Sequence, residues 1–340
     1  MTAVTFNASH AAHAEPGHPE RPARLDAVAE AIAADPALAD LVRLDAPPAP
    51  REALEAIHPP EYLDLLEAFC AAGGGALDVD TYATPASLDV ARQSVGGLLA
   101  VVDAVFDRCN NGFAIGRPPG HHARPAQAMG FCLLANAAIA ARHAQRAHGA
   151  ERVLIVDVDV HHGNGTQEAF LDDPSVLFVS SQQENIYPGG GALSEIGVGA
   201  GEGFTVNLPL PVGTGDELAG LYRAVLPPLA DRFRPDLVLV SFGADTHRLD
   251  PLSGLALSVD GLADVVGAIQ EVADAHADGR LVLTLEGGYH PAVLAASVAA
   301  VLRRLLDPAA EIVDPFGPTC LPPRDLAPLA DAVRQRHGLP

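Results

Sequence analysis

Short apolar runs that alternate with helical stretches constrain the fold of this 340-residue chain more than any other feature. Continuous apolar runs rich in β-branched residues suit strands that are buried on both faces. Such runs alternating with helices predict an α/β fold, in which an open, mainly parallel sheet carries helices on both faces. The runs are Phe113–Ile115, Val153–Val160, Val176–Ser180, Leu237–Ser241 and Leu281–Leu285, and the helical stretches include Ser87–Phe106, Leu133–His148, Asp216–Phe233 and Asp260–Ala277.

The domain organisation follows from what the sequence lacks. No Pro/Gly/Ser linker, charge run or tandem repeat divides the chain, and 49% of its residues are hydrophobic, which is enough for a substantial core. We therefore expect residues 1–340 to form a single catalytic domain.

The charge limits the classes of partner. The formal net charge is −22, and all 21 basic residues are arginine. A surface of this sign repels phosphate backbones, so we expect no nucleic-acid partner. It would attract a cationic substrate, although the acidity can equally serve solubility alone.

The cysteines and the apolar segments indicate the compartment. Cys70, Cys109, Cys132 and Cys320 are scattered without CxxC spacing, which predicts free thiols in a reducing cytosol. We see no signal peptide and no uninterrupted apolar run of about 18 residues. The expected localisation is therefore cytoplasmic, without a membrane partner.

Polar residues follow four of the apolar runs, at or near the point where each run ends. The loops are Arg117–His122, Asp157–Gly165, Gly243–Asp245 and Glu286–Tyr289. Ligands of open α/β sheets bind beyond the carboxyl ends of the strands. We therefore expect the four loops to meet at one edge of the sheet and to bring carboxylates, imidazoles and a phenol together there.

The second of these loops has the residue types of a metal site. Asp157, Asp159 and His161 are two residues apart, so an extended segment would point all three to one side. Carboxylate and imidazole suit a divalent transition metal, and Asp245 could add a ligand from a neighbouring strand end. Three protein ligands leave a position open for water and substrate, as in catalytic sites. A buried, mutually hydrogen-bonded cluster is the alternative, and His162 would point away.

His121 and His122 follow the sequence Arg117-Pro-Pro-Gly. Two imidazoles beside a metal can transfer protons, because histidine titrates close to neutral pH. Each would need an orienting partner, and Asp157 and Asn164 are the candidates. A rigid turn would fix both side chains, which argues against an ordinary pair of surface histidines.

Tyr289 follows Glu-Gly-Gly at the end of the last apolar run. Glycines let the backbone approach a ligand closely. A phenol there could donate a hydrogen bond to a developing oxyanion. A structural tyrosine is the alternative, and only the neighbouring motifs favour the functional interpretation.

With these motifs, the chain resembles the histone deacetylase superfamily, which includes acetylpolyamine amidohydrolases and shares its fold with arginase. Asn164 stands where class I members carry Asp, so the resemblance is to class II-like bacterial members. It implies an arginase/deacetylase-like sheet of about eight strands. The matching segments are His18–Arg24, Arg117–Ala123, Met129–Cys132, Val153–Gln167, Tyr187–Gly189, Asn207–Pro211, Gly243–Leu255 and Glu286–Tyr289.

The resemblance implies a zinc-dependent amidohydrolase that removes an acetyl or similar acyl group from an amine. Zinc would polarise the amide carbonyl and a water molecule, while a histidine takes the proton of the water. The implied residues are Asp159, His161 and Asp245 for zinc, His121 backed by Asp157 and His122 backed by Asn164 as the acid/base pair, and Tyr289 for the acyl carbonyl.

The resemblance also implies a substrate tunnel. An apolar rim at Leu252 suits a lysine side chain whose charge is cancelled by acylation, so we expect an acyl-lysine peptide as substrate. An acetylpolyamine or a small metabolite is the alternative. The implied substrate-binding residues are Phe131, Tyr187 and Gly130 along the tunnel, Leu252 and Asp80 at the rim, and Arg24 along an inner channel for acetate.

One departure from the family lies close to a second implied ion. Family members commonly carry His at the position of Gln182, which puts the local loop in doubt but not the metal site. The resemblance implies a structural potassium ion surrounded by Asp157, Asp159, His161, Ser180 and Ser181.

Two other functions fit the same fold. A binuclear manganese ureohydrolase would need additional carboxylates to bridge a second metal, whereas His121, His122 and Tyr289 follow the deacetylase pattern. A catalytically inactive acyl-lysine binding module would be expected to lack a ligand, a histidine or the tyrosine, and none is missing. The sequence does not indicate the oligomeric state, and a homo-oligomer is compatible with it.

Overall fold

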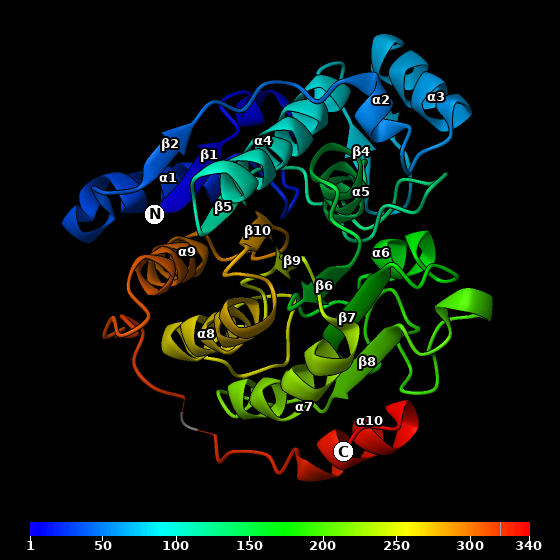
Figure 1. Ribbon diagram of the computed structural model, residues 1–340. Helices are drawn as coiled ribbons and strands as arrows, with labels where there is room; N and C mark the ends of the chain where they lie inside the picture. Colours follow the sequence, from blue (N-terminus) through cyan, green and yellow to red (C-terminus); the bar gives the residue numbers. More distant parts are fainter. Residues whose placement is uncertain (320) are drawn as a thin grey trace.

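A parallel sheet of eight strands forms the centre of the computed structural model, which describes residues 1–319 and 321–340. The strand order is β2-β1-β5-β10-β9-β6-β7-β8 (Figure 1). The strands are β1 Thr2–Phe6, β2 Val42–Leu44, β5 Asn111–Ile115, β6 Val153–Asp157, β7 Val176–Gln183, β8 Thr205–Leu210, β9 Leu237–Phe242 and β10 Leu281–Leu285, and the short strands β3 Gly75–Ala76 and β4 Tyr82–Ala83 pair separately.

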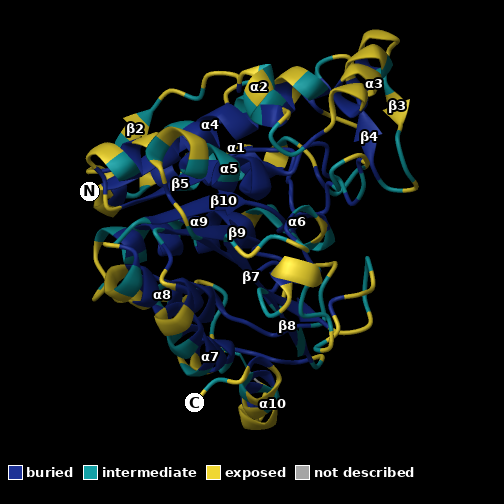
Figure 2. Cartoon of the chain, turned by 45° about the vertical axis from the view of Figure 1, so that its right-hand side comes forward, coloured by how far each residue is buried: buried dark blue, intermediate teal, exposed yellow. Residues whose placement is uncertain are grey.

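Both faces of this sheet are buried, which explains why its strands read as continuous apolar runs. In β6, Leu154 and Val156 belong to one hydrophobic cluster, whereas Val153 and Ile155 belong to the cluster on the other face. Figure 2 shows the central strands as buried, while exposed residues lie on the surrounding helices and loops and on the peripheral strands β2 and β3. Burial on two sides requires apolar residues at consecutive positions, because neighbouring side chains point to opposite faces.

Helices cover the two faces as separate layers. Helices α1, α7, α8 and α9 pack against one another on one face, with α10 outside α7, and α4 packs with α5 on the other face. The α/β class with helices on both faces is therefore confirmed. The helices are α1 Ala23–Ala34, α2 Arg51–Leu54, α3 Pro60–Ala71, α4 Ser87–Asp107, α5 Asn136–His148, α6 Asn164–Ala169, α7 Leu218–Phe233, α8 Val259–His276, α9 Pro291–Leu306 and α10 Ala327–His337.

Some element boundaries differ from the expectation. The strand expected at Val153–Val160 ends at Asp157, where side chains begin to take the backbone hydrogen bonds. The Asp157 carboxylate accepts a hydrogen bond from the Asp159 amide at 3.1 Å, and the Asp159 carboxylate accepts one from the His161 amide at 2.9 Å. Asp159 and His161 thus lie in a loop folded by its own side chains, and the strand periodicity expected for them was wrong.

Two expected helices begin later than their periodicity suggests. The stretch expected from Leu133 becomes helical at Asn136, and the one expected from Asp216 at Leu218. The Asp216 carboxylate instead accepts hydrogen bonds from the amide and hydroxyl of Ser258, at 2.8 and 2.9 Å. Because Asp216 is paired with Ser258 at the start of α8, the helix α7 begins only after Asp216.

The sheet order explains how distant motifs meet. The four strands followed by polar loops are β5, β10, β9 and β6, which are adjacent at the centre of the sheet. Since all are parallel, their carboxyl ends lie along one edge. The sheet therefore places the four loops next to one another, although they span more than half of the chain.

The described residues also bear on the cysteines and on the membrane. Cys70, Cys109 and Cys132 are free thiols, as expected, and Cys320 lies outside the described residues. Among residues 1–319 and 321–340, no helix is both long enough and apolar enough to cross a membrane.

Candidate metal centre and active site

Three potential metal ligands meet at the edge of the sheet. The ligand atoms of Asp159, His161 and Asp245 all lie within 4.8 Å of one another. Nδ1 of His161 is 3.1 Å from Oδ1 of Asp159 and 3.4 Å from Oδ2 of Asp245. Both carboxylates are fully buried, and Oδ2 of Asp245 has no hydrogen-bond partner. A buried carboxylate oxygen without a partner is costly, so the cluster fits a cation.

The backbone around the cluster is shaped to hold these carboxylates. Oδ2 of Asp159 accepts a hydrogen bond from the Gly287 amide at 2.8 Å, and Oδ1 of Asp245 accepts one from the Val160 amide at 3.1 Å. A Cβ atom at Gly287 would collide with carboxylate oxygens of both Asp245 and Asp159. Glycine is therefore required where the loop after β10 passes the ligands.

The histidine pair lies beside the ligands, and each ring has a separate partner. Nδ1 of His121 is 3.0 Å from Oδ2 of Asp157, and Nδ1 of His122 is 2.8 Å from Oδ1 of Asn164. The two ring centroids are 3.9 Å apart. The structure thus brings together both pairs that the sequence suggested.

The protein groups alone push the two imidazoles toward opposite charge states. Burial lowers the pKa of His121, but the carboxylates of Asp159 and Asp157 outweigh it and raise that pKa to about 10. Burial, together with the neighbouring His121 and His161, lowers the pKa of His122 well below its usual value. The field therefore favours a charged His121 and a neutral His122.

A cavity of about 300 Å³ leads to this cluster. Most of the predicted substrate-binding residues line it, together with the candidate metal ligand His161, the acid/base candidate His122 and the phenol of Tyr289. Ile186 also lines it, a residue that sequence reasoning missed, although it precedes the predicted Tyr187. The lining residues are Asp80, His122, Gly130, Phe131, His161, Ile186, Tyr187, Leu252 and Tyr289.

Phe131 is held in the cavity wall by an unusual backbone. Its φ of 67° is rare for a bulky residue, and its amide donates a hydrogen bond to Oγ1 of Thr81 at 3.0 Å. Gly130 has a positive φ, and a Cβ there would collide with the His122 ring. The Phe131 ring lies edge-to-face against Tyr289, with centroids 5.6 Å apart. This turn therefore places the Phe131 ring in the same cavity wall as His122 and Tyr289.

Two residues fix the position of Tyr289. Oδ2 of Asp250 accepts a hydrogen bond from the Tyr289 amide at 2.6 Å, while its Oδ1 accepts one from the Leu252 amide at 3.0 Å. The Arg24 guanidinium lies 5.1 Å from the centroid of the Tyr289 ring. It also donates hydrogen bonds to the carbonyls of Gly288 and Glu286, at 2.7 and 2.5 Å. Arg24 is thus buried behind the tyrosine and does not line the described cavity.

Comparison with known proteins supplies an independent observation. A sequence model described as the histone deacetylase domain matches residues 18–305. The chain belongs to the histone deacetylase family.

Relatives from several kingdoms share this similarity. The chain is 39% identical to the histone deacetylase-like amidohydrolase of Pseudomonas aeruginosa over 304 residues, which cover 88% of this chain and 80% of that protein. It is 42% identical to the chloroplastic histone deacetylase 14 of Arabidopsis thaliana over 266 residues, which cover 76% of this chain but only 63% of that protein. It is 39% identical to the human polyamine deacetylase HDAC10 over 319 residues, which cover 88% and 46% of the two chains.

A solved structure of the family has the same fold. The crystal structure of the HDA15 HD domain aligns with a TM-score of 0.87 and 36% sequence identity, covering 99% of this chain and 96% of that one. The expected arginase/deacetylase-like sheet is therefore confirmed.

Sequence reasoning gave no role to three acidic residues that organise this deacetylase-family site. One of them is Asp250, which holds the Tyr289 amide. The second is Glu286, whose Oε2 accepts hydrogen bonds from the amides of Gly120 and His121 at 2.6 and 3.1 Å. The third is Glu20. All three stand inside motifs that carry the family resemblance. Their position in those motifs was the available signal, but it could not say which atoms they would hold.

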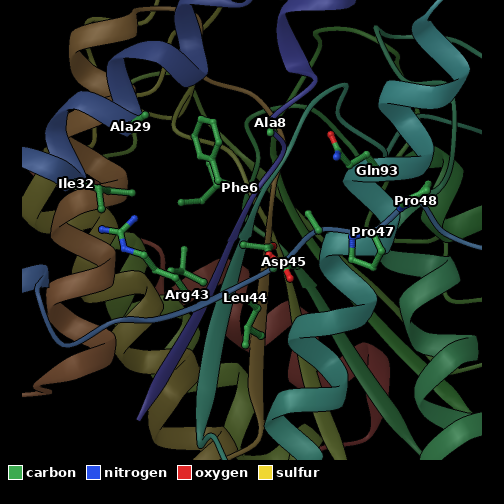
Figure 3. Close-up of a pocket in the computed structure, with 14 residues that line it drawn as sticks. Phe6, Ala8, Ala29, Ile32, Arg43, Leu44, Asp45, Pro47, Pro48 and Gln93 are labelled. Carbon is green, nitrogen blue, oxygen red and sulfur yellow. The ribbon is translucent and has the colours of Figure 1, made fainter.

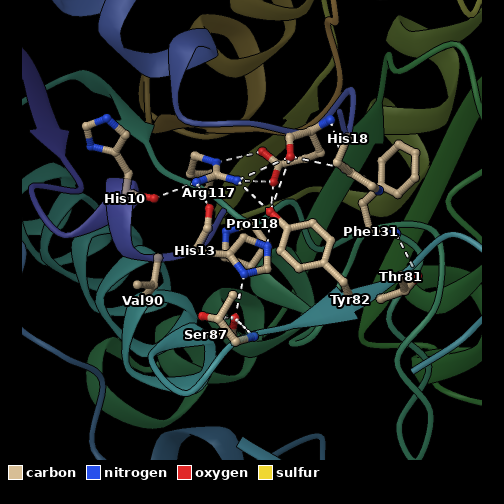
Figure 4. A network of polar contacts seen from close by, with 12 residues as sticks. His10, His13, His18, Thr81, Tyr82, Ser87, Val90, Arg117, Pro118 and Phe131 are labelled. Atoms are coloured by element: carbon tan, nitrogen blue, oxygen red, sulfur yellow. Dashed lines mark hydrogen bonds and ion pairs between the residues drawn. The ribbon is translucent and has the colours of Figure 1, made fainter. Parts of the chain in front are cut away.

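Glu20 is the centre of a fully buried charge network, and Figure 4 shows the polar contacts of its partner Arg117. Oε1 of Glu20 accepts hydrogen bonds from Arg117 Nε and Arg24 Nη1, both at 2.8 Å, and Oε2 accepts one from Arg117 Nη2. Arg117 precedes the histidine turn and Arg24 holds the Tyr289 loop. The network therefore connects the turn that carries the histidine pair to the loop that carries Tyr289.

Glu20→Gln should destabilise the protein by about 3–5 kcal/mol, because it leaves two buried guanidinium groups without a carboxylate. Burial raises the pKa of Glu20, but Arg117 and Arg24 outweigh it and lower the pKa from 4.5 to about 2. The contribution is thus complete above pH 4.5 and is lost as the pH falls toward 2. Urea unfolding at pH 7 measures the loss.

The matched control is Glu55→Gln, which breaks the partly exposed surface pair Arg51–Glu55. It should cost much less than Glu20→Gln, because water screens a pair at the surface. Equal costs for the two substitutions would show that the Glu20 network does not hold the site.

Three of the five residues of the expected potassium site, Asp157, Ser180 and Ser181, lie on two paired strands. Ser180 and Ser181 are buried on β7, and Asp157 of β6 is the register partner of Ser180. Oγ of Ser181 accepts a hydrogen bond from the Tyr222 hydroxyl at 2.6 Å. The potassium ion itself stays a prediction.

Gln182, the departure from the family pattern, lies in β7 rather than in a loop. Its side-chain amide donates a hydrogen bond to the Gly191 carbonyl at 2.6 Å. Gln182 therefore anchors the glycine-rich segment that follows Tyr187.

A larger cavity of about 620 Å³ lies elsewhere, beside the edge strand β2 (Figure 3). Residues of β1, β2, α1 and α4 line it, among them Phe6, Ile32, Leu44 and Gln93. It contains none of the predicted site residues, so cavity size alone would have misplaced the site.

Proposed function

We propose that this chain is a zinc-dependent deacetylase that hydrolyses N-acylated amines and prefers acyl-lysine side chains of peptides. The observation that carries the proposal is the 300 Å³ cavity, whose lining brings together His161, His122 and Tyr289 with the aromatic Phe131. Amide hydrolysis needs a Lewis acid, a proton acceptor and an oxyanion donor around one reacting carbon. These three side chains can supply or support each of those roles.

Zinc fits the ligand cluster by its chemistry. Two carboxylates and one imidazole, at Asp159, Asp245 and His161, match a catalytic zinc site with an open position. A bound zinc ion would polarise the acyl carbonyl and lower the pKa of a water molecule. The unpartnered Oδ2 of Asp245 supports this assignment.

His122 is the proposed general base. Oδ1 of Asn164 can only accept a hydrogen bond, so Nδ1 of His122 carries the hydrogen and Nε2 keeps its lone pair. His122 lines the cavity, whereas His121 is not among the lining residues. Nε2 of His122 would take a proton from the attacking water and return it to the amine that leaves.

His121 is proposed to act from behind its neighbour. Its contact with Asp157 and its raised pKa favour the imidazolium form. A positive charge adjacent to the cavity would stabilise the negative charge that develops on the substrate. It also keeps His122 neutral before the reaction, because two adjacent imidazolium groups repel each other.

The wall of the cavity supports the substrate preference. Phe131 and Tyr187 flank a passage suited to an aliphatic arm, and Leu252, which is 39% exposed, stands at its rim. An apolar rim does not pair with the inner ammonium groups of a polyamine. Asp80 also lines the cavity and would accept hydrogen bonds from a peptide backbone.

An acetylpolyamine is the second candidate substrate, and three observations favour it. Asp80 could pair with an ammonium group, and a relative of this chain is named a polyamine deacetylase. The net charge of −22 would also attract polycations. Diffuse surface charge is screened beyond about 8 Å at physiological salt, so we give the local rim more weight.

We further propose that residues 1–340 act as one catalytic domain.

Steady-state kinetics on an acetyl-lysine peptide, acetylspermidine and acetylputrescine test the function. The peptide should give the highest kcat/KM, because its neutral arm passes an apolar rim. Leu252→Glu should narrow the gap, because it adds a carboxylate where the inner ammonium of a polyamine would lie. Leu252→Gln is the matched control, since it is polar without charge and should leave polyamine hydrolysis low.

The possible outcomes test the substrate preference and the deacetylase activity separately. A preference of tenfold or more for acetylpolyamines would overturn the acyl-lysine assignment and leave the deacetylase proposal intact. Absence of acetate release from all three substrates, with the metal bound, would overturn the deacetylase proposal itself.

A further inference from the structure

A second group of metal-ligating side chains lies outside the proposed active site. Nε2 of His143 is 2.6 Å from Oδ1 of Asp103, and Nε2 of His148 is 2.7 Å from the same oxygen. Asp103 belongs to α4, and both histidines belong to α5. Two imidazoles from one helix thus converge on a single carboxylate oxygen of another helix.

We propose that Asp103, His143 and His148 form a surface binding site for a divalent transition-metal ion. Two imidazoles and one carboxylate are ligands suited to zinc, nickel and copper, and less so to magnesium or calcium. The site would be three-coordinate in protein ligands, with the remaining position open to water. It is independent of the proposed deacetylase function.

The geometry of the cluster is close to what such an ion requires. The ligand atoms all lie within 4.8 Å of one another. A tetrahedral zinc ion with bonds of about 2.0–2.1 Å holds its ligand atoms about 3.3 Å apart. Each nitrogen would therefore have to move by less than 1 Å from the Asp103 oxygen. The half-exposed Asp103 side chain has room for that shift.

The histidines are held in place before any ion binds. The His148 ring stacks on Phe106 with centroids 4.5 Å apart and an interplanar angle of 7°, and the Arg280 guanidinium lies 5.2 Å from the centroid of the Phe106 ring. The side chains of His143 and His148 are only 22% and 23% exposed. Ordinary surface ion pairs contribute little to stability, whereas packing against Phe106 also holds the His148 ring.

Asp103 is also in the protonation state that a ligand needs. Partial burial raises the pKa of Asp103, but its contacts with His148 and His143 outweigh that effect and lower the pKa. The carboxylate is therefore ionised at neutral pH, and both imidazole Nε2 atoms already face it.

The cluster lies at the edge of the sheet opposite the proposed active site. α4 ends at Asp107, shortly before β5 begins, and α5 ends at His148, shortly before β6 begins. Residues that precede these strands lie near their amino ends, whereas the catalytic loops follow the carboxyl ends. A bound ion would link α4 to α5 without touching the substrate cavity, and would stabilise the fold by mass action.

Equilibrium dialysis of the folded protein against zinc, followed by elemental analysis, tests the site. Wild type should bind about one zinc ion per chain more than the double variant His143→Ala/His148→Ala. Asp103→Asn should weaken the additional ion at least about tenfold while preserving the shape of the side chain. Zinc should raise the Tm of wild type by more than that of either variant, because the ion joins two helices.

His276→Ala is the matched control. His276 faces the single carboxylate of Asp231 at 3.8 Å, so it offers one imidazole instead of two. This variant should keep the additional ion. Unchanged acetyl-peptide hydrolysis or an unchanged circular dichroism spectrum would show that the variants are folded. Equal zinc binding by wild type and the folded double variant would overturn the proposal.

Discussion

Asp245→Ala is expected to remove the bound metal and the hydrolytic activity together. Asp245 contributes a fully buried carboxylate whose Oδ2 has no hydrogen-bond partner, so its loss leaves two ligands, Asp159 and His161. Two ligands hold zinc weakly, and losing several kcal/mol of charge stabilisation lowers kcat by about 10³-fold or more. Elemental analysis of the purified variant and a progress curve on an acetyl-lysine peptide measure both losses.

His161 and His162 provide a matched pair for the same experiment. His161 lies in the ligand cluster, whereas Nδ1 of the adjacent His162 lies 3.5 Å from Oγ of Ser180. His161→Ala should lose zinc, and His162→Ala should keep it. Full zinc occupancy in Asp245→Ala and His161→Ala would contradict the ligand assignment.

Tyr289→Phe should keep the fold and the metal but lower kcat by about 100- to 1000-fold. The Tyr289 ring contacts Phe131 and Arg24, and phenylalanine preserves both contacts. Only the hydroxyl disappears, and with it the hydrogen bond proposed for the oxyanion. An interaction made only in the transition state lowers kcat and kcat/KM equally and leaves KM unchanged.

Tyr187→Phe is the control, because Tyr187 lines the same cavity and is proposed to act through its ring. It should change kcat by less than about tenfold. If Tyr289→Phe altered KM alone, Tyr289 would bind substrate without assisting the chemistry.

The fold could be predicted from the sequence because the signals for it are local. Continuous apolar runs such as Leu281–Leu285 suit strands that are buried on both faces, as in a parallel sheet between helix layers, and β10 has these bounds in the structure. The sheet-edge rule then predicted that the four polar loops would meet. That prediction required only that the strands be parallel, and it did not require their order in the sheet.

The boundaries could not be predicted, because side chains decide them through distant contacts. β6 ends at Asp157, since the carboxylates of Asp157 and Asp159 take over the backbone hydrogen bonds of the next residues. α7 starts late because Asp216 pairs with Ser258, 42 residues away. Periodicity within one segment contains no information about such partners.

The supporting residues of the candidate site were hidden for the same reason. Glu20 and Arg117 are 97 residues apart, and Asp250 and Tyr289 are 39 apart, yet each pair shares a hydrogen bond. Sequence spacing showed which residues could do chemistry. The three-dimensional structure was needed to show which residues position them, and the roles of both sets remain predictions for the experiments above.

Acetate release from an acetyl-lysine peptide by wild-type protein, before and after chelation, tests the central claim most directly. The protein is assayed as purified, after dialysis against a strong chelator, and after zinc is added back. We predict that chelation abolishes acetate release and that about one zinc ion per chain restores it. Acetate release that persists in the metal-free protein, or that zinc fails to restore in folded protein, would contradict metal-dependent hydrolysis at Asp159, His161 and Asp245.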